Sequence, residues 1–358
     1  MASSPRAISL PATDIAPAIQ TALLHGIDAI AADAAGALDR ERQPSMYNRL
    51  DWLRLTAAHV LADCRLLCVR ARAADGSARL FLAGGDKRCA RAFAGWYTLD
   101  VSPAFSPGTS RARQVQLLAE VAGALRRDFD RIDLQPVAAA TADLVREAFS
   151  RVGWWTVEAD ATANWVADVK GIGFDEYWRA RPSRLRNTVR RKLKDSGLET
   201  RVFRHFDPAA WADYEAVYAA SWKPQEGSPA FLRALAEIEG EAGCLRLALA
   251  YRDGRPVAGQ FWTVDRGIAT IHKLAYVEAE KAASPGTVLS HATFRHVLEE
   301  DRPDLIDYGN GDEPYKAEWM TRRRMTRRIT MFNQRSLGGV AAAARSAAVT
   351  LIRRSRHD

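Results

Sequence analysis

The sequence predicts an α+β fold built from two tandem lobes, each with a mixed, mostly antiparallel sheet flanked by helices. A chain of 358 residues is long enough for two domains of ordinary size. Residues 245–276 hold three runs of β-branched and apolar residues separated by two Gly-containing turns, which is typical of an antiparallel meander. The first half of the chain gives roughly the same order of elements, so the two halves are predicted to share one architecture.

The chain divides into an N-terminal extension (1–44), a first lobe (45–180), a basic connecting helix (181–197), a second lobe (198–335) and a basic tail rich in Ala and Arg (336–358). With 47% hydrophobic and 26% charged residues, the composition is that of a soluble globular protein. No run of 18 uncharged apolar residues is present, which argues against a membrane-spanning helix. The N-terminus lacks the apolar core of a signal peptide, and the cysteines lack metal-ligand spacing. We therefore expect a cytoplasmic protein without a bound metal.

Helical spacing of apolar residues, such as Leu50, Leu53, Ala57 and Leu61, predicts the helices of the first half, and short apolar runs between turn residues predict its strands. The pair Gln135-Pro136 is expected to end a strand. Helices are expected at 15–38, 49–61, 111–127 and 142–152, and strands at 66–71, 79–83, 96–101, 131–134, 154–158 and 164–169.

The elements of the second half follow from breakers and caps as well as from periodicity. Arg181-Pro182 is expected to break a short helix, and Ser183 to cap a strongly basic helix that closes at Gly197. Helices are expected at 174–180, 184–196, 208–220, 231–238, 285–297 and 338–354, and strands outside the meander at 199–205, 305–308 and 328–332.

The turn after the meander, Ser284-Pro285-Gly286-Thr287, leads from a strand into a helix. The first N–H groups of a helix have no partners within the helix, and this end of the helix carries a positive partial charge. The turn therefore suits a pyrophosphate group.

This order of meander, Gly-bearing turn, helix and further strand resembles the acyl-CoA-binding half of the GNAT superfamily of N-acetyltransferases. The family's pyrophosphate loop reads Gln/Arg-x-x-Gly-x-Gly/Ala. Here Lys281-Ala-Ala-Ser284-Pro-Gly286 matches only the last Gly, with Lys and Ser in the other two places. The resemblance implies that Lys281, Ser284, Gly286, Thr287 and Val288 bind acetyl-CoA or another acyl-CoA as co-substrate. The first half has no comparable turn, so no acyl-CoA site is expected there.

The string from Asp307 to Trp319, D-x-G-x-G-x-x-x-Y-K-x-x-W, resembles the CelD-type acetyltransferase-like proteins of polysaccharide biosynthesis loci, which are relatives of the FemAB aminoacyl transferases. Ser221-Trp222-Lys223 fits the same group, and the resemblance covers most of residues 45–335. It implies N-acylation, most simply acetylation, of an amine on a sugar- or lipid-linked acceptor in cell-surface polysaccharide biosynthesis. Two alternatives stay open. One is a FemAB-like transferase that uses aminoacyl-tRNA, and the other is a non-catalytic basic module that binds nucleic acid or membrane.

Acyl transfer to an amine needs a hydrogen-bond donor to the thioester oxygen, an acceptor for the amine's proton and a proton for the leaving thiolate. The resemblance implies the first role for Lys316, whose alternative is a lysine at a solvated helix start. Asp307 is a candidate for the second role. Tyr308 and Tyr315 are candidates for the third, although a buried tyrosine with a satisfied hydroxyl is the simpler interpretation of each.

Three residues are candidates for contact with the acceptor. Trp222 and Lys223 lie in an expected loop between two helices, where such folds often admit the acceptor. His272, inside the third run of the meander, faces either a substrate groove or the core as a structural histidine. The aromatic residues at helical spacing in the preceding helix are predicted to be core: Trp211, Tyr214 and Tyr218.

The formal net charge of +8 is concentrated in two segments. Residues 179–194 hold eight basic residues and no acidic one, and residues 320–358 hold ten Arg and one Asp. Such segments imply anionic partners, which include an anionic small molecule, a sugar-nucleotide or lipid-linked acceptor, tRNA, or a membrane surface reached by the tail. Arg186, Arg190 and Lys194 form a stripe along one helix face, expected to bind the anionic part of the acceptor or tRNA, unless it is an ordinary solvated face.

Overall fold

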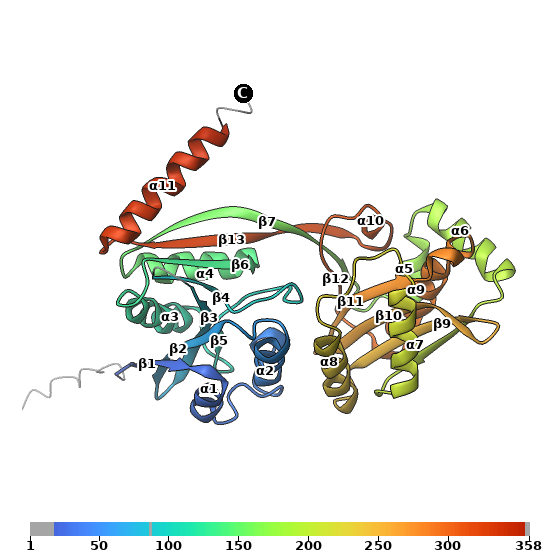
Figure 1. Cartoon of the computed structure of the whole chain (residues 1–358), viewed down its shortest axis with the longest axis horizontal. Coiled ribbons are helices and arrows are strands. Elements are labelled where there is room, and N and C mark those ends of the chain that lie inside the picture. The colour runs from blue at the N-terminus through green and yellow to red at the C-terminus, as the bar shows by residue number, and fades with distance from the viewer. Residues whose placement is uncertain (1–17, 86–87, 355–358) are drawn as a thin grey trace, which may run out of the picture.

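The computed structural model describes residues 18–85 and 88–354, with the side chains up to residue 348. The protein consists of two lobes, each a sheet covered by helices, joined by two long strands that arch from one lobe to the other (Figure 1). The α+β fold with two helix-flanked lobes is therefore confirmed, and the two arching strands join the strands of both lobes into one mixed sheet.

The first lobe contains strands β1 (Gln20–His25), β2 (Arg65–Ala73), β3 (Gly76–Gly84), β4 (Cys89–Ala92), β5 (Ala104–Phe105) and β6 (Arg131–Val137), and helices α1 (Gly26–Ala34), α2 (Leu50–His59), α3 (Arg111–Leu125) and α4 (Ala139–Ser150). A short 3₁₀ turn at Met46–Asn48 precedes α2. Successive side chains of β2 point to opposite faces of the sheet, as in any strand. Leu67 and Val69 pack with α3 and α4, whereas Leu66 and Cys68 pack with α1 and α2.

The second lobe contains α5 (Phe174–Arg179), α6 (Ser183–Asp195), β8 (Glu199–Phe203), α7 (Pro208–Ala219), α8 (Pro229–Glu241), β9 (Leu245–Arg252), β10 (Arg255–Asp265), β11 (Ile268–Tyr276), α9 (Pro285–His296), β12 (Leu305–Asn310) and α10 (Lys316–Trp319). A 3₁₀ segment (Glu278–Ala283) precedes α9 and a π-helical turn (Val297–Asp301) follows it. The same alternation places two helix layers on opposite faces. Leu247 and Leu249 of β9 pack with α7 and α8, whereas Ala248 and Ala250 pack with Leu289 of α9.

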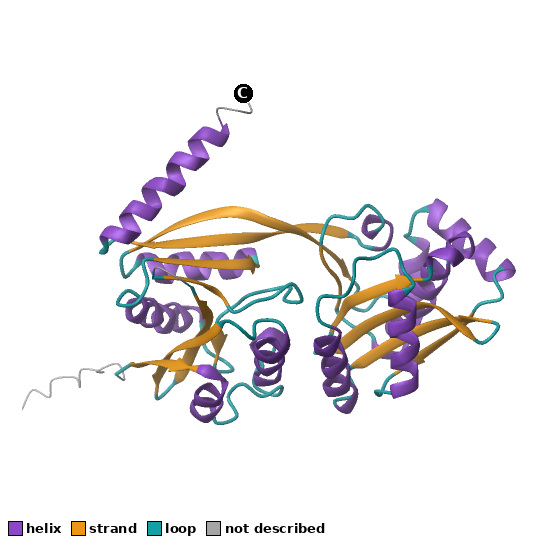
Figure 2. Cartoon of the chain, viewed as in Figure 1, coloured by secondary structure: helices purple, strands orange, loops and turns teal. Residues whose placement is uncertain are grey.

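The two lobes share strands β7 (Trp154–Asp168) and β13 (Arg322–Asn333), which pair antiparallel from Arg322 with Val166 to Asn333 with Trp154, with a register shift between Met325 and Arg327. In the first lobe β13 pairs with β6, and in the second lobe β7 pairs with β12. Among the described residues the strand order is β1-β2-β3-β4-β6-β13-β7-β12-β11-β10-β9-β8, with β5 paired to β3. The helices, purple in Figure 2, cover this sheet within each lobe, while β7 and β13 cross between the lobes.

The shared strands are longer than the sequence predicts. Residues 154–158 and 164–169 are parts of one strand, and the closing strand starts at Arg322 rather than at Arg328. The sequence pattern predicted a break between residues 158 and 164 because the residues there are small or polar. In the structure a charged residue of this segment pairs with the neighbouring strand, as in the Asp160–Arg327 salt bridge. The strand before them was also expected to stop at Gln135-Pro136, but β6 continues to Val137 with that peptide bond in the cis form.

Two further expectations for the first half were wrong. Residues 20–25 form a strand rather than part of a helix, because Gly26, with φ of 77°, separates β1 from α1. This segment, expected as an extension, completes the sheet of the first lobe. Residues 96–101 are irregular, and the third strand is β4. Tyr97 of this irregular run is buried instead by packing against α8 of the second lobe, where its ring stacks on Phe231.

The tail helix α11 (Leu337–Arg354) follows β13 and projects away from the two lobes (Figure 1). Its Leu337 and Val340 are among the most exposed apolar side chains, at 92% and 53%. None of the helices in the described part of the chain has the length and apolar character that crossing a membrane requires.

Candidate functional site

A cavity lies where β11 and β12 separate. The two strands are parallel neighbours only where Ile268–Thr270 pairs with Leu305–Asp307. Beyond this register they no longer pair, and a space of about 200 Å³ opens at the point of separation. We call it the splay cavity. It is lined by Trp96, Tyr97, Leu99, Lys223, Ile271, His272, Lys273, Leu274, Tyr308, Gly309, Asn310, Glu313, Tyr315 and Lys316.

Lys316 supplies a buried ammonium group to this cavity. The residue is only 4% exposed, which excludes the alternative of a lysine at a solvated helix start. Its Nζ donates to the carbonyl oxygen of Asn310 at 2.8 Å and lies 2.9 Å from Oε2 of Glu313. These two partners fix Nζ at the cavity wall, where it presents a hydrogen-bond donor.

Tyr308 and Tyr315 stand beside Lys316. Their rings pack edge to face with centroids 5.8 Å apart, and Lys316 Nζ lies 5.7 Å from the centroid of the Tyr308 ring. Burial raises the pKa of Tyr308 well above its ordinary value and that of Tyr315 to about 12. Both hydroxyls are therefore protonated at neutral pH.

Asp307, one residue before Tyr308, faces away from the splay cavity. Its Oδ1 accepts from Asn164 Nδ2 and from the Gly309 N–H, each at 2.8 Å. Its Oδ2 accepts from Arg324 at 3.1 Å. Asp307 lines a different cavity, at the junction of the lobes, so the structure separates it from Lys316 and the two tyrosines.

His272 lines the splay cavity but is held by its neighbours. Its Nε2 lies 2.9 Å from Thr263 Oγ1 on β10, and its ring packs on Phe261. Burial lowers the pKa of His272 to about 3, with a smaller effect from Lys273. The histidine is therefore neutral at physiological pH, with one ring nitrogen engaged in a cross-strand hydrogen bond.

The turn into α9 adopts an unusual backbone conformation. Ser284 has φ of 54° and ψ of 46°, the left-handed region that favours glycine, which occupies this place in the loop that the sequence resembles. The Ser284 carbonyl accepts the N–H groups of Thr287 and Val288. Gly286 N–H has no hydrogen-bond partner among the described residues. The first turn of α9 thus offers one free backbone donor.

Side chains around this turn also affect its charge. Lys281 is exposed and pairs with Glu278 at 3.1 Å, so part of its charge is compensated. Lys192 of α6 donates to the carbonyl oxygen of Ala282 at 2.6 Å and brings a second ammonium group to the loop. Lys192 belongs to the basic helix that the sequence predicts, but its contact with this loop was not predicted, because no spacing relates it to residues ninety positions later.

Lys223 and Trp222 occupy the loop between α7 and α8. Trp222 is 56% exposed, and the Lys223 side chain turns inward to line the splay cavity. Lys273 Nζ lies 2.7 Å from Glu226 Oε2, and Glu226 also accepts from the Tyr97 hydroxyl. Sequence reasoning missed this Lys273–Glu226–Tyr97 cluster, since its members come from three distant segments of the chain.

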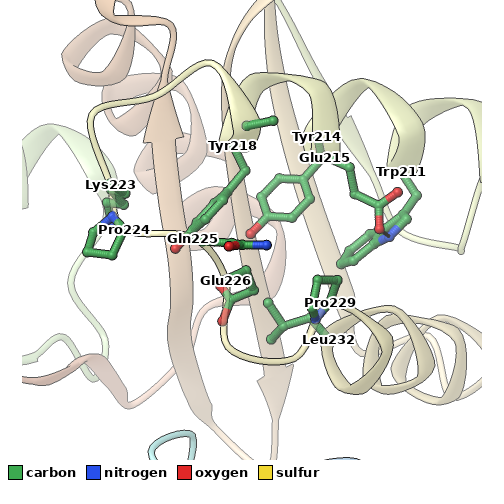
Figure 3. A pocket seen from close by; sticks show the side chains of 11 residues that line it. Trp211, Tyr214, Glu215, Tyr218, Lys223, Pro224, Gln225, Glu226, Pro229 and Leu232 are labelled. Atoms are coloured by element: carbon green, nitrogen blue, oxygen red, sulfur yellow. Dashed lines mark hydrogen bonds between the residues drawn. The ribbon is translucent and has the colours of Figure 1, made fainter.

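A second, larger cavity lies between α7 and the loop that leads into α8 (Figure 3). It measures about 470 Å³, and we call it the helix cavity. The residues predicted to be core, Trp211, Tyr214 and Tyr218, form one wall of it. Trp211 and Tyr214 are buried, as predicted, whereas Tyr218 is only half-buried, and the cavity beside them was not foreseen.

The stripe of Arg186, Arg190 and Lys194 faces a groove between α6 and α9. The groove measures about 690 Å³, and α9 contributes His291 and Arg295 to it. We call it the basic groove. It lies on the α9 face of the sheet, whereas the helix cavity lies on the α7 face. The stripe is therefore separated from the helix cavity by the sheet itself.

The described part of the chain contains no group of three or more His, Cys, Asp or Glu residues placed to hold a metal ion. The polar groups of the splay cavity are amines, tyrosine hydroxyls, the amide of Asn310, the carboxylate of Glu313 and the imidazole of His272. These groups can orient and exchange protons with an organic substrate.

Comparison with known proteins relates this site to a family. Residues 183–317, which include the splay cavity's lysines, match the model of an acetyltransferase (GNAT) domain. No match was found among curated protein sequences. The fold is similar to that of FemX, with a TM-score of 0.62 and 11% identity over 84% of this chain and 96% of that chain.

Two further solved structures share the fold. A conserved protein of unknown function from Bacteroides thetaiotaomicron has a TM-score of 0.54 and 14% identity over 85% of this chain and 97% of that one. A structure described as the C-terminal domain of a lysylphosphatidylglycerol synthetase from Agrobacterium fabrum has a TM-score of 0.50 and 15% identity, covering 76% and 85%. At such identities the likeness shows the fold alone. Residues 183–317 thus match an acetyltransferase (GNAT) domain, and the chain as a whole shares the fold of FemX.

Proposed function

We propose that the second lobe transfers an acyl group from an acyl-CoA to an amine, with the acyl end of the donor in the splay cavity. The observation that carries the proposal is the separation of β11 from β12 beyond Thr270 and Asp307. In this chain the opening leads to the splay cavity, and the buried Lys316 lies in the wall of that cavity. An elongated donor can enter between the strands and present its carbonyl to that group.

Polar groups along the opening fit an acyl-CoA. Oδ1 of Asn310 is buried without a hydrogen-bond partner among the described residues, which suits an amide N–H of the donor. The free N–H of Gly286 at the start of α9 suits a phosphate oxygen. An acyl-CoA supplies an activated thioester at the end of such a chain.

The side chains of the splay cavity have the properties that acyl transfer needs. Lys316 Nζ donates a hydrogen bond from a buried position, where a charge-assisted bond to a developing oxyanion is strong. Tyr308 and Tyr315 carry protons at neutral pH and suit the protonation of a leaving thiolate. Asp307 is not part of this proposal, because its oxygens are occupied by Asn164, Gly309 and Arg324.

A second candidate is transfer from aminoacyl-tRNA, and two observations favour it. Among the described residues, the first turn of α9 offers one free backbone donor, and carboxylates such as that of Glu278 lie nearby. This turn is therefore a weak binding site for the pyrophosphate of CoA, which favours a donor other than acyl-CoA. The basic groove lies on the same face as α9 and suits the phosphates of a polyanion. In both cases the acyl acceptor is an amine, which we place on a sugar- or lipid-linked molecule of cell-surface biosynthesis.

A donor-binding screen separates the two candidates. Thermal unfolding of the full chain is followed with acetyl-CoA, with octanoyl-CoA and with uncharged and aminoacylated tRNA. A ligand that binds the folded state raises the midpoint in proportion to the logarithm of its concentration. We expect stabilisation by at least one acyl-CoA. Stabilisation by aminoacyl-tRNA alone would favour the second candidate, and no stabilisation by either ligand would reject both.

A further inference from the structure

The helix cavity is enclosed by two helices and the loop between them (Figure 3). The rings of Tyr214 and Tyr218 extend from α7 toward the loop, and the side chains of Gln225 and Glu226 meet them from the other side. Leu232 and Pro229 of α8 close the cavity from below in this view. Its volume of about 470 Å³ is enough for a small organic group.

Most of the wall is apolar and aromatic, so the cavity favours a ligand with an apolar body. The polar groups of the wall include two carboxylates, those of Glu215 and Glu226. Glu215 accepts from Trp211 Nε1 at 2.9 Å and retains a second oxygen, and Glu226 stands beside the tyrosine hydroxyls. Aromatic faces together with carboxylates attract an amine or its ammonium form.

One buried polar group lacks a partner. The hydroxyl of Tyr214 is directed toward the loop side of the cavity, and Tyr214 is only 2% exposed. This hydroxyl forms no hydrogen bond among the described residues. A buried hydroxyl without a partner is rare, because its lost hydrogen bonds to water are not replaced. A ligand with a hydrogen-bonding group inside the cavity would satisfy it.

Lys223 joins the helix cavity to the splay cavity. Its side chain is the only one among the described residues that lines both. Next to it, Glu226 of the helix cavity pairs with Lys273 of the splay cavity. A group bound between α7 and α8 therefore lies next to the place where we put the acyl carbonyl.

We propose that the helix cavity is the acceptor subsite for an amine with an apolar body, and that Lys223 takes the proton from its ammonium group. This inference rests on the proposed acyl transfer and names its acceptor class. Lys223 accepts one proton from the ammonium group, and the neutral amine forms the new C–N bond. The C–S bond of the donor breaks, and the second amine proton ends on the leaving thiolate.

The surroundings of Lys223 suit this role. Burial lowers the pKa of Lys223 to about 8, and Lys273 and Lys316 act in the same direction. Glu313 and Glu226 oppose the shift, and the effect of Glu313 is larger than that of Lys316 but smaller than those of burial and Lys273. The amine of Lys223 is therefore neutral in an appreciable fraction of molecules near pH 8, whereas an ordinary lysine is almost fully charged.

Binding to the cavity is tested with 2-phenylethylamine as the apolar amine and ethanolamine as the polar one. Calorimetric titration of the full chain measures each affinity, with and without saturating CoA, which carries no acyl group to transfer. Ala219→Trp, at the rim, and Leu232→Trp, deeper in the wall, fill the cavity. Leu337→Trp on the exposed start of α11 is the matched control. We expect the wild type to bind 2-phenylethylamine more tightly than ethanolamine. The affinity for 2-phenylethylamine should fall at least tenfold in Ala219→Trp and should not change in the Leu337→Trp control.

Proton transfer is tested by the pH dependence of kcat/KM for 2-phenylethylamine with acetyl-CoA, measured as released thiol. We expect the wild type to rise with pH to a plateau above about pH 8, since Lys223 must be neutral to act. Lys223→Arg keeps the charge but cannot accept the proton. Its kcat/KM at pH 7.5 should therefore be at least tenfold lower than that of the wild type, and its pH profile should lack the rise near pH 8.

The outcomes are distinguishable from a failure of the proposed function. Acetyl-CoA binding with unchanged amine affinity in Ala219→Trp would overturn the acceptor subsite while leaving the donor site intact. A wild-type pH profile in Lys223→Arg would overturn the role of Lys223. Cavity-dependent amine binding without any binding of acetyl-CoA would support the subsite and reject the acyl-CoA donor.

Discussion

Arg324 and Asp307 form an ion pair, with Nη2 3.1 Å from Oδ2, that ties β13 to β12 across the intervening strand β7. Asn164 of β7 completes the link, since it donates to Asp307 and accepts from Arg324 Nε at 2.6 Å. These bonds lie where the two lobes exchange strands. We infer that Asp307 fixes the geometry of β12, and through it the position of the splay cavity.

Asp307→Asn should therefore destabilise the protein rather than abolish the chemistry. The substitution removes the charge opposite Arg324 and places an NH₂ group against existing donors, which costs about 1–3 kcal/mol of unfolding free energy. Urea denaturation measures this loss, with Asp304→Asn, whose exposed carboxylate pairs with Lys170, as control. Unchanged stability with a hundredfold lower rate would instead make Asp307 a catalytic base.

Lys316→Met should lower kcat for acyl transfer about a hundredfold or more, with a smaller change in KM, because a donor to the oxyanion acts mainly in the transition state. Methionine keeps much of the length of the buried side chain. Lys170→Met, at an exposed lysine that also pairs with a carboxylate, is the matched control and should be active. A near-normal kcat in a folded Lys316→Met variant would remove Lys316 from the mechanism.

The stability of the protein should fall in mild acid partly because of His272. Its pKa is about 3 in the folded state, below the value near 6.5 expected when unfolded, so the unfolded chain binds more protons between these limits. Stability is present above about pH 6.5 and declines as the pH falls toward 3. His291, with its pKa lowered to about 4 mainly by burial, acts in the same direction.

His272→Gln tests this assignment, since glutamine does not titrate and can still pair with Thr263. The unfolding free energy, measured at pH 7 and pH 5, should fall less in this variant than in the wild type. His59→Gln on the exposed face of α2 serves as control and should follow the wild type. Equal pH dependence in His272→Gln and wild type would show that His272 does not drive the acid effect.

The triple variant Arg186→Gln, Arg190→Gln and Lys194→Gln removes the positive charge of the stripe on α6. It should bind tRNA more weakly than the wild type and bind acetyl-CoA with unchanged affinity. Each lost phosphate contact lowers the slope of log affinity against log salt by about 1. Fluorescence anisotropy with labelled tRNA, from 50 to 300 mM salt, measures that slope. A matched triple variant at exposed arginines of the first lobe uses Arg54, Arg111 and Arg151. The same slope in both triple variants would make the stripe an ordinary solvated surface.

Most helices and strands could be predicted from the sequence, because turn residues and the spacing of apolar residues are local signals. The meander of 245–276 is present as β9, β10 and β11. The exchange of β7 and β13 between lobes was not predictable. Pairing between residues such as Asp160 and Arg327 joins segments more than 160 positions apart, and no periodicity records it.

The candidate site divides in the same way. Lys316 and Tyr308 came from one continuous motif, and the structure brings them together in the splay cavity. Asp307, from the same motif, faces the opposite side because neighbouring residues of a strand alternate. Glu226 of the helix cavity and Lys273 of the splay cavity meet only through tertiary packing, so no sequence pattern indicated their ion pair.

The most direct test of an acyl-CoA donor is calorimetric titration of acetyl-CoA into wild type, Gly286→Glu and Gly123→Glu. Gly286 stands at the start of α9, where glutamate adds a negative charge beside the free N–H. A Cβ at Gly123 meets no atom within 4 Å, so the same substitution there is the control. We predict saturable binding to wild type and to Gly123→Glu, with at least a tenfold loss in a folded Gly286→Glu variant. Equal affinity in all three proteins, or no binding to the wild type, would contradict an acyl-CoA site at α9.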